Sequence, residues 1–469
     1  MISISDFLPD RTFSSFSRRE FLRVGTLGFG GLSLASVLES RASAALPANV
    51  MRPKSIVMLF LQGGPSHIEF FDPKMTAPSE FRSITGEVPT SMPGITFGGT
   101  FPKLAKLADK FSIVRSYGSK NAGHTYQRVL SANNPLQATV SSVYSRVAGT
   151  NHPQTGMPLN TLVLPEAIEP EMKLGKNFET NALPGLTAAG DLGQNFAAFN
   201  PIGGGELKDN MELKLTPERF GDRKSLLSSL DRIRRDVDSD GLIEFTDEYQ
   251  RQAFEIITRG VAHAFDLSQE DAKTIAKYDT SHVFKNKDIQ RWGDMRRSTN
   301  LLGKQMLMAR RLVEAGCGFV TVSDCGWDMH SNGNSPKNLA GMYPLGNQVD
   351  HAVAAFIQDI EDRGLTNDVL LIVTGEMGRT PRINRNGGRD HYGELTPLLF
   401  YGGGLKMGQV IGQSDRQVSR PASRPYNPSN LFATIMHTLF DVGELRLVQS
   451  VPRDIAQIIE EHEPIVELM

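Results

Sequence analysis

The stretch "SIVMLFLQGGP", residues 55–65, indicates the fold. Its apolar residues run without interruption over the length of one strand and end at Gln62, Gly63, Gly64 and Pro65. A strand that lacks polar alternation is buried on both faces, which is typical of parallel sheets covered by helices. We therefore expect an α/β fold.

Similar apolar runs predict further strands at residues 111–116, 160–165, 319–323, 369–374 and 397–404. Apolar residues recur at helical spacing over 302–313 and 349–360, so helices separate the later strands. This alternation predicts an α/β sandwich, in which ligands bind at the carboxyl ends of the strands. Residues 216–300 are charged and helical in pattern, and we expect them to form a helical insertion.

The composition argues against several partners. The 469 residues carry 50 basic and 52 acidic side chains, a formal net charge of −2, so we expect neither nucleic acid nor an anionic membrane as partner. A small-molecule substrate or a protein partner fits better. Cys317 and Cys325 form neither a disulfide framework nor a metal–thiolate cluster, and we interpret both as ordinary thiols.

The N-terminus has the pattern of an export signal. Paired arginines in "SRREFLR", residues 17–23, precede a glycine-rich apolar run and then Ala42-Ser43-Ala44. The apolar run is shorter than the roughly 20 residues of a membrane-spanning helix. We predict a twin-arginine signal peptide at 1–44 and a mature domain at 45–469. The protein would then use the twin-arginine machinery, work in the periplasm or outside the cell, and keep no membrane anchor after cleavage.

Polar side chains follow three of the predicted strands. Ser66 follows the first strand, Asp328 and His330 follow the strand at 319–323, and Glu376 and His391 follow the strand at 369–374. Histidine and carboxylate groups at strand ends suit a divalent metal site or a general acid and base. The alternative is that these loops are only structural, because Asp, Asn, Ser and Gly are common in any loop.

Two further segments have patterns that favour the binding of an ion. "DVDSDGLIEFTD", Asp236 to Asp247, matches the spacing of a calcium-binding EF-hand loop, although a charged junction between helices gives the same pattern. His124, Thr125 and Arg128 lie at a predicted helix start, where backbone N–H groups favour an anion. The alternative there is an ordinary helix cap.

Several motifs together resemble a known family. They are "FLQGGPSHIEFFDPK", "ARRLVEAGCGFVTV", "GWDMH", "DIEDRGL", "TGEMGRTPRINRNGGRDHYG" and "GGGLKMGQVIGQSD". The chain resembles the exported bacterial family catalogued as domain of unknown function 1501, which is similar to the alkaline phosphatase and sulfatase superfamily. The resemblance spans nearly the whole mature chain. It implies an alkaline-phosphatase-like three-layer sandwich with a largely parallel central sheet and a metal at the strand ends.

The resemblance also implies site residues. It implies Asp328, His330, Glu376 and His391 as metal ligands and Thr125 as the nearest hydroxyl to the nucleophile's place. Together with the residues at the strand ends and the helix start, we expect catalytic roles for Thr125, Ser66 and His124, with a metal-bound water as the alternative attacking group, and substrate binding by Arg379, Arg389 and Arg128. This chain has Gln62 and Gly63 where the superfamily has a metal-binding Asp, and Met377 where it has a His. One divalent ion is therefore expected rather than two.

Two hypotheses follow. The first is an exported metal-dependent hydrolase of phosphate or sulfate esters, acting on a small molecule or a polysaccharide, in which the metal polarises the ester oxygen. The second is a catalytically silent exported binding or assembly protein that retains the sulfatase-like fold. The departures at Gln62 and Met377 favour the second.

Overall fold

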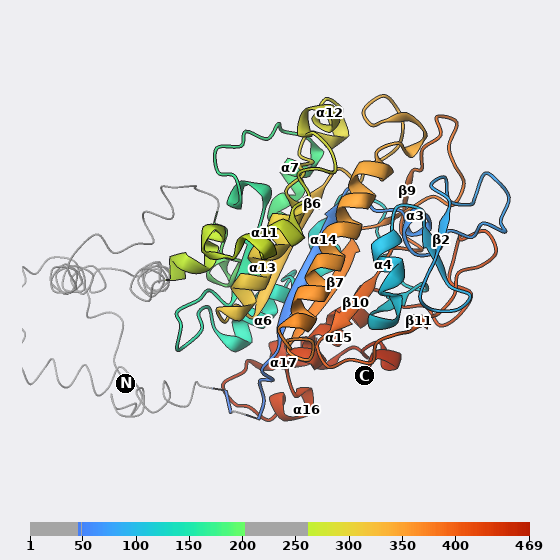
Figure 1. Ribbon diagram of the computed structural model, residues 1–469. Helices are drawn as coiled ribbons and strands as arrows, with labels where there is room; N and C mark the ends of the chain where they lie inside the picture. Colours follow the sequence, from blue (N-terminus) through green and yellow to red (C-terminus); the bar gives the residue numbers. More distant parts are fainter. Residues whose placement is uncertain (1–45, 48, 202–260) are drawn as a thin grey trace, which may run out of the picture.

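A seven-stranded sheet forms the centre of the protein (Figure 1), in a computed structural model that describes residues 46–47, 49–201 and 261–469. In spatial order the strands are β11 (Val410–Ile411), β4 (Ser112–Val114), β10 (Leu399–Gly402), β7 (Val369–Gly375), β1 (Ser55–Gln62), β6 (Phe319–Cys325) and β5 (Asn160–Val163). Strand β1 pairs in parallel with β6 and β7, β5 with β6, and β11 with β4. The predicted, largely parallel sheet is therefore confirmed.

The exception is β10, which runs antiparallel to both β7 and β4. A parallel connection needs a crossover, usually a helix, between its two strands. The described chain between β7 and β10 contains no helix and only the short strands β8 (Gly378–Arg379) and β9 (His391–Tyr392). The chain turns at the carboxyl end of β7 and returns beside it, so the long loop stays at that edge of the sheet.

Helices cover both faces of the sheet, as the alternation of side chains along β1 requires. Val57, Leu59 and Leu61 pack in one hydrophobic cluster with α13 (Leu302–Glu314) and α14 (Met342–Asp362), which cross in front of the sheet in Figure 1. Ile56, Met58 and Phe60 pack in a second cluster with α6 (Val140–Ala148), α15 (Pro428–Leu439) and α17 (Arg453–Glu460). The α/β sandwich therefore has three layers.

The remaining elements are short. They are α3 (His67–Phe70), β2 (Glu87–Pro89), β3 (Thr96–Gly98), α4 (Pro102–Lys106), α5 (Tyr126–Leu130), α7 (Phe178–Ala182), α11 (Ala272–Tyr278), α12 (Asn286–Gln290) and α16 (Val442–Leu445). Among the residues described, no helix is long and apolar enough to span a bilayer. The 261–300 part of the predicted helical insertion folds as α11, α12 and 3-10 turns.

Three predictions fall wholly or partly outside the described residues. The signal peptide at 1–44 and the EF-hand-like stretch Asp236–Asp247 lie wholly outside them. Residues 216–260 of the predicted insertion do so too.

Candidate metal centre

Three loops bring the candidate side chains together at the carboxyl edge of the sheet. Asp328 and His330 follow β6, Glu376 follows β7, and His391 lies in β9 at the far end of the same loop. The loop after β4 adds His124, just before α5. Parallel strands whose carboxyl ends share one edge place these loops side by side, as the rule for ligand sites in α/β sheets predicts.

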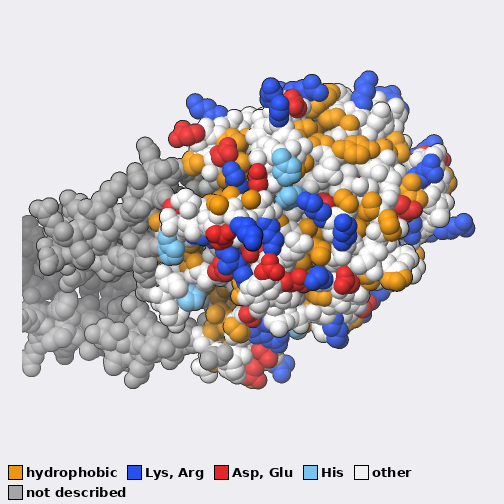
Figure 2. Space-filling view, in the orientation of Figure 1, with side chains coloured by type: hydrophobic (Ala, Val, Ile, Leu, Met, Phe, Trp, Pro, Cys, Tyr) orange, Lys and Arg blue, Asp and Glu red, His pale blue; other side chains and the backbone are white. Residues whose placement is uncertain are grey.

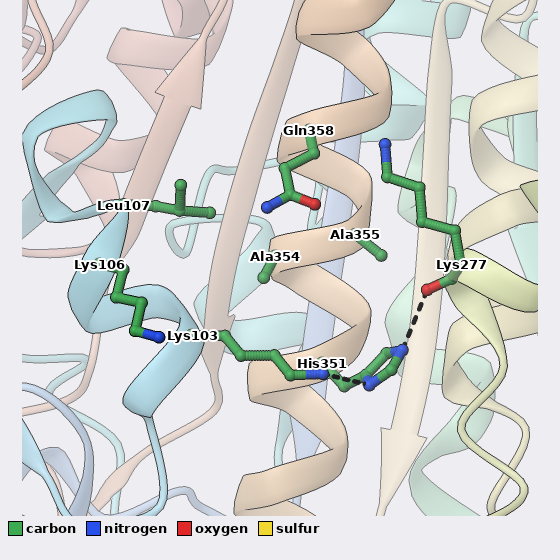
Figure 3. Close-up of a pocket in the computed structure, with 8 residues that line it drawn as sticks. All are labelled: Lys103, Lys106, Leu107, Lys277, His351, Ala354, Ala355 and Gln358. Atoms are coloured by element: carbon green, nitrogen blue, oxygen red, sulfur yellow. Dashed lines mark hydrogen bonds between the residues drawn. The ribbon is translucent and has the colours of Figure 1, made fainter.

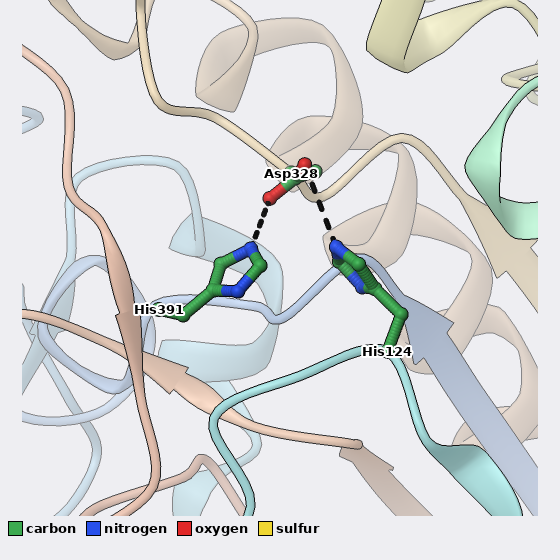
Figure 4. A group of neighbouring side chains, drawn as sticks. All are labelled: His124, Asp328 and His391. Carbon is green, nitrogen blue, oxygen red and sulfur yellow. Dashed lines mark hydrogen bonds and ion pairs between the residues drawn. The ribbon is translucent and has the colours of Figure 1, made fainter.

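Asp328 is the centre of the cluster (Figure 4). Its Oδ1 atom lies 3.0 Å from Nε2 of His391 and 3.0 Å from Nε2 of His330. Nε2 of His124 lies 3.6 Å from the other carboxylate oxygen, Oδ2. The Nε2 atoms of all three imidazoles are therefore directed at one carboxylate group.

Each of these imidazoles is oriented by an oxygen atom at its other nitrogen. Nδ1 of His124 lies 2.9 Å from Oε1 of Glu376. Nδ1 of His330 lies 2.7 Å from Oδ1 of Asp390, and Nδ1 of His391 lies 3.2 Å from the carbonyl oxygen of Ala122. Because these oxygens can only accept from the ring, each Nδ1 carries a proton, and each Nε2 can offer a lone pair to a metal ion once the ion has displaced the Nε2 proton. Metal-binding histidines have this arrangement.

A positive environment surrounds Asp328. Burial alone raises the pKa of Asp328, but hydrogen bonds from the three imidazoles and the charge of Arg379 outweigh burial and hold this pKa well below its ordinary value. Burial lowers the pKa of His124, yet its contacts with Asp328 and Glu376 raise it to about 9. Without a metal the His124 imidazole is thus an ion-pair partner of these two acids, and a divalent cation would take the place of its Nε2 proton.

The donor set fits one divalent ion. One ligand atom each from His124, Asp328 and His391 lies within 4.8 Å of the other two. Oε2 of Glu376 is buried and has no hydrogen-bond partner in the described part of the chain. A buried carboxylate oxygen without a partner is costly unless a cation or water satisfies it. Three protein ligands with an open position are typical of catalytic metal sites.

The predicted ligands therefore have different places in the structure. Asp328 and His391 belong to the tight group, whereas His330 lies on the Arg379 side of Asp328. Glu376, predicted as a ligand, orients His124 through Oε1, which also accepts from the backbone N–H of Gly63 at 2.9 Å, while its Oε2 has no partner in the described part of the chain. His124, predicted as catalytic, lies in the group that could hold an ion. The sequence alone does not tell which carboxylate faces which imidazole.

The predicted arginine clamp is not formed by Arg389. This side chain is fully buried, and its five N–H donors bond to Glu69 and to the carbonyls of Phe81, Arg82, Thr380 and Pro381. A guanidinium has five donors, so none remains for a substrate. Arg389 holds the loop in place, and its predicted role in substrate binding is wrong.

Arg379 is also committed within the protein. Its guanidinium bonds to Asp328 and to the carbonyls of Gly63, Gly64 and Arg389, and it lies 3.4 Å from Nε2 of His330. It joins the loops that follow β1, β6 and β7. Arg379 is therefore a positioning residue for Asp328 in this structure.

The remaining predicted site residues, Thr125, Ser66 and Arg128, lie in or next to the short helices α3 and α5. Thr125 is the exposed N-cap of α5, and its hydroxyl makes no hydrogen bond to a residue that the structure describes. Ser66 is the buried N-cap of α3, where its hydroxyl accepts from the N–H of Glu69 at 3.4 Å. Arg128 is exposed on α5. Thr125 follows His124 directly in the chain.

A second group of acids lies around the cluster. Burial raises the pKa of Glu179 to about 8, and burial together with the charge of Asp328 raises the pKa of Asp294 to about 6. Glu179 accepts from the backbone N–H of Gly326 at 2.8 Å, which fixes the turn between β6 and Asp328. No sequence motif singled out these two acids, because their role depends on loops distant in the chain.

The fold and the site define an α/β protein with a candidate single-metal centre at the carboxyl edge of its sheet. Residues 53–448 match the family model described as "Protein of unknown function (DUF1501)". The chain belongs to this family, as its motifs indicated. No curated protein matches it in sequence.

Solved structures whose backbone follows a similar path include a sulfatase, a phosphonate monoester hydrolase and a lipoteichoic acid synthase. The PsFucS1 sulfatase from Pseudoalteromonas sp. is 12% identical, with 90% of this chain and 72% of that chain covered and a TM-score of 0.35. The phosphonate monoester hydrolase SpPMH from Silicibacter pomeroyi is 11% identical, with 82% and 73% covered and a TM-score of 0.31. The lipoteichoic acid synthase LtaP from Listeria monocytogenes is 8% identical, with 83% and 72% covered and a TM-score of 0.30. Likeness at this level says nothing about activity.

Proposed function

We propose that the protein is a metal-dependent hydrolase of phosphate or sulfate esters. The observation that carries the proposal is the convergence of three Nε2 atoms on Asp328, with an oxygen atom orienting each imidazole. A cluster that served only to stabilise the loops would not need three oriented imidazoles around a single carboxylate. Perturbed ionisable groups that converge at a strand edge are typical of functional sites.

His124, Asp328 and His391 would hold the ion, with His330 as a further donor beside them. A divalent cation there would supply Lewis-acid polarisation of the ester oxygen. Glu376 and the Ala122 carbonyl keep the imidazoles of His124 and His391 in the tautomer that the ion requires.

The protein groups have separate tasks in the reaction. Thr125 offers an exposed hydroxyl beside His124 as the nucleophile. The dyad of His330 and Asp390, joined at 2.7 Å, is placed to accept or donate a proton next to Asp328. Arg379 stabilises the Asp328 carboxylate without contacting substrate.

The substrate class follows from the charges at the site. Three imidazoles and Arg379 face Asp328, and Glu376 and Asp390 lie on the outer sides of two of these imidazoles. With a divalent cation held at its centre, the site would suit a group with several anionic oxygens. Substrates would be phosphate or sulfate esters of small molecules or polysaccharides. We further propose that the twin-arginine machinery exports the protein, so that it works in the periplasm or outside the cell.

The proposal is tested with the purified chain that begins at residue 45. We expect it to hydrolyse aryl phosphate or aryl sulfate esters, to lose this activity with a chelator, and to regain it with one of Zn²⁺, Mn²⁺, Mg²⁺ or Ca²⁺. A chain that binds metal and turns over neither ester class contradicts the proposal.

A second candidate is a catalytically silent exported binding or assembly protein. The observation that favours it is the commitment of every donor of Arg379 and Arg389 within the protein, so that neither of these two guanidinium groups is free to hold a transferred group. Metal binding without turnover would support this candidate.

A further inference from the structure

A pocket of about 310 Å³ lies away from the metal centre, between α4 and α11 and over the middle of α14. Ala354 and Ala355 form its floor, because small side chains on α14 leave room between the flanking helices. Polar side chains surround this floor (Figure 3). They are Lys103, Lys106, Lys277, His351 and Gln358.

The pocket has more cations than acids to pair with them. Lys277 is paired with Asp362 at 2.8 Å. Neither Lys103 nor Lys106 makes an ion pair with a carboxylate in the described part of the chain. Figure 2 shows lysine and arginine side chains interspersed with acidic ones on the face that α14 crosses. Like charges held close together repel, and a bound anion relieves that repulsion.

A neutral imidazole fixes one of these ammonium groups. Nε2 of His351 lies 3.0 Å from the carbonyl oxygen of Lys277, so that nitrogen carries the proton and donates. Nδ1 of His351 then accepts from the Lys103 ammonium at 2.6 Å. Burial of the imidazole and the charge of Lys103 both lower the pKa of His351, which keeps the ring neutral. Because the imidazole that accepts from Lys103 is neutral, the ammonium group keeps its full positive charge and can still attract an anionic ligand.

The nearest buried acid is used by the backbone. Oδ2 and Oδ1 of Asp350 accept from the N–H groups of Lys103 and Leu104, at 3.0 and 2.7 Å. Asp350 is buried, so it fixes the first turn of α4 and with it the stem of Lys103. The lysine positions are therefore built into the packing of α4 on α14.

We propose that this pocket binds a tetrahedral oxyanion, a sulfate or phosphate group. Lys103 and Lys106 from α4 would contact its oxygens on one side, and Lys277 and Gln358 would contact them on the other. Lysine ammonium groups bind such oxygens as point charges and need no planar geometry. The group is either a free anion or an ester on a larger molecule, and the inference does not depend on activity at the metal centre.

The test measures binding of inorganic sulfate and inorganic phosphate to the mature chain by equilibrium dialysis, with chloride used to keep ionic strength constant. Sulfated dextran, compared with plain dextran, probes the ester-borne group. The variant Lys103→Gln/Lys106→Gln removes the two unpaired cations. Lys285→Gln/Lys287→Gln makes the same change of charge at exposed lysines elsewhere, and His391→Ala disables the metal centre.

We expect saturable binding that weakens by about tenfold or more in Lys103→Gln/Lys106→Gln, because charge-assisted hydrogen bonds are lost. Lys285→Gln/Lys287→Gln should bind as the unaltered chain does, and His391→Ala should lose at most the binding that belongs to the metal centre and keep the binding that Lys103→Gln/Lys106→Gln weakens. Binding of the inorganic ions indicates a free anion, and binding of sulfated dextran alone indicates an ester-borne group. The inference is overturned if no probe binds saturably, if Lys103→Gln/Lys106→Gln binds normally with an unchanged circular dichroism spectrum, or if only His391→Ala loses binding. Lys106→Met tests the same point should the double variant fail to fold.

Discussion

Nε2 of His391 lies 3.0 Å from Oδ1 of Asp328, although 63 residues separate them in the chain. The contact joins the loop after β6 to the far end of the loop after β7. It exists because parallel pairing places both strand ends at one edge of the sheet. Gly63 and Arg379 are among the groups that hold this contact in place.

Gly63 brings β1 against the Asp328 loop. Its φ is +111°, and a Cβ atom there would lie 2.5 Å from the backbone nitrogen of Asp328. We expect Gly63→Ala to lower the free energy of unfolding by about 3 kcal/mol, from backbone strain and overlap together. Gly86→Ala is the matched control, since its φ is +79° with nothing within 4 Å. Equal losses in urea denaturation would show that only the backbone angle matters.

Arg379 is the buried cation that faces Asp328. Arg379→Met leaves that carboxylate and three loop carbonyls without their donor, and we expect a loss of about 3 kcal/mol in unfolding free energy. Arg382→Met changes an exposed arginine of the same loop and should stay within about 0.5 kcal/mol. Guanidinium titrations measure both. A loss in Arg379→Met no larger than in this control contradicts the positioning role.

His67 makes stability depend on pH. It is fully buried, and burial lowers the pKa of His67 from 6.5 to about 4, while its Nε2–H donates to the Val418 carbonyl at 3.1 Å. The unfolded chain takes up the proton first, so stability is complete above pH 6.5 and is lost as pH falls toward 4. The loss is about 3 kcal/mol for this group.

The measurement compares the unaltered chain with His67→Gln, which keeps a donor to Val418. Unfolding free energies at several pH values between 7.5 and 4 should fall more steeply for the unaltered chain. Parallel curves would mean that folding does not lower the pKa of His67.

Thr125 and Ser66 are competing nucleophile candidates. We expect Thr125→Ala to lower turnover of an aryl ester by about a thousandfold while metal content is unchanged, because only the attacking group is removed. Ser66→Ala removes the N-cap of α3 and should change stability by about 1 kcal/mol and turnover little. The opposite ranking of turnover would assign the nucleophile to Ser66.

Much of the fold could be predicted from the spacing of apolar residues within single strands and helices. The strand of residues 55–61 and the helix at 302–313 were predicted because burial on two faces, or on one helical stripe, leaves a direct mark in the sequence. The reversed direction of β10 left no such mark. It depends on how the chain between Glu376 and Leu398 returns along the sheet.

The sequence predicted which residues lie at the site better than it predicted what each of them does. Asp328, His330 and His391 follow apolar strands, so the sequence places them at one edge. The pairing of His124 with Glu376 spans 252 residues, and that of His330 with Asp390 spans 60. Such pairings depend on tertiary packing and have no local pattern. Arg389 was assigned to a substrate for the same reason, since its burial beneath the loop is not visible in the sequence.

The central claim is that His124, Asp328 and His391 hold one divalent ion, and metal analysis of the purified mature chain tests it most directly. We predict about one equivalent of a single metal per chain, lost in His391→Ala and Asp328→Asn and kept in His462→Ala, a histidine outside the cluster. A metal-free chain that also fails to take up added Zn²⁺, Mn²⁺, Mg²⁺ or Ca²⁺ would contradict the account, as would a metal retained in both cluster variants.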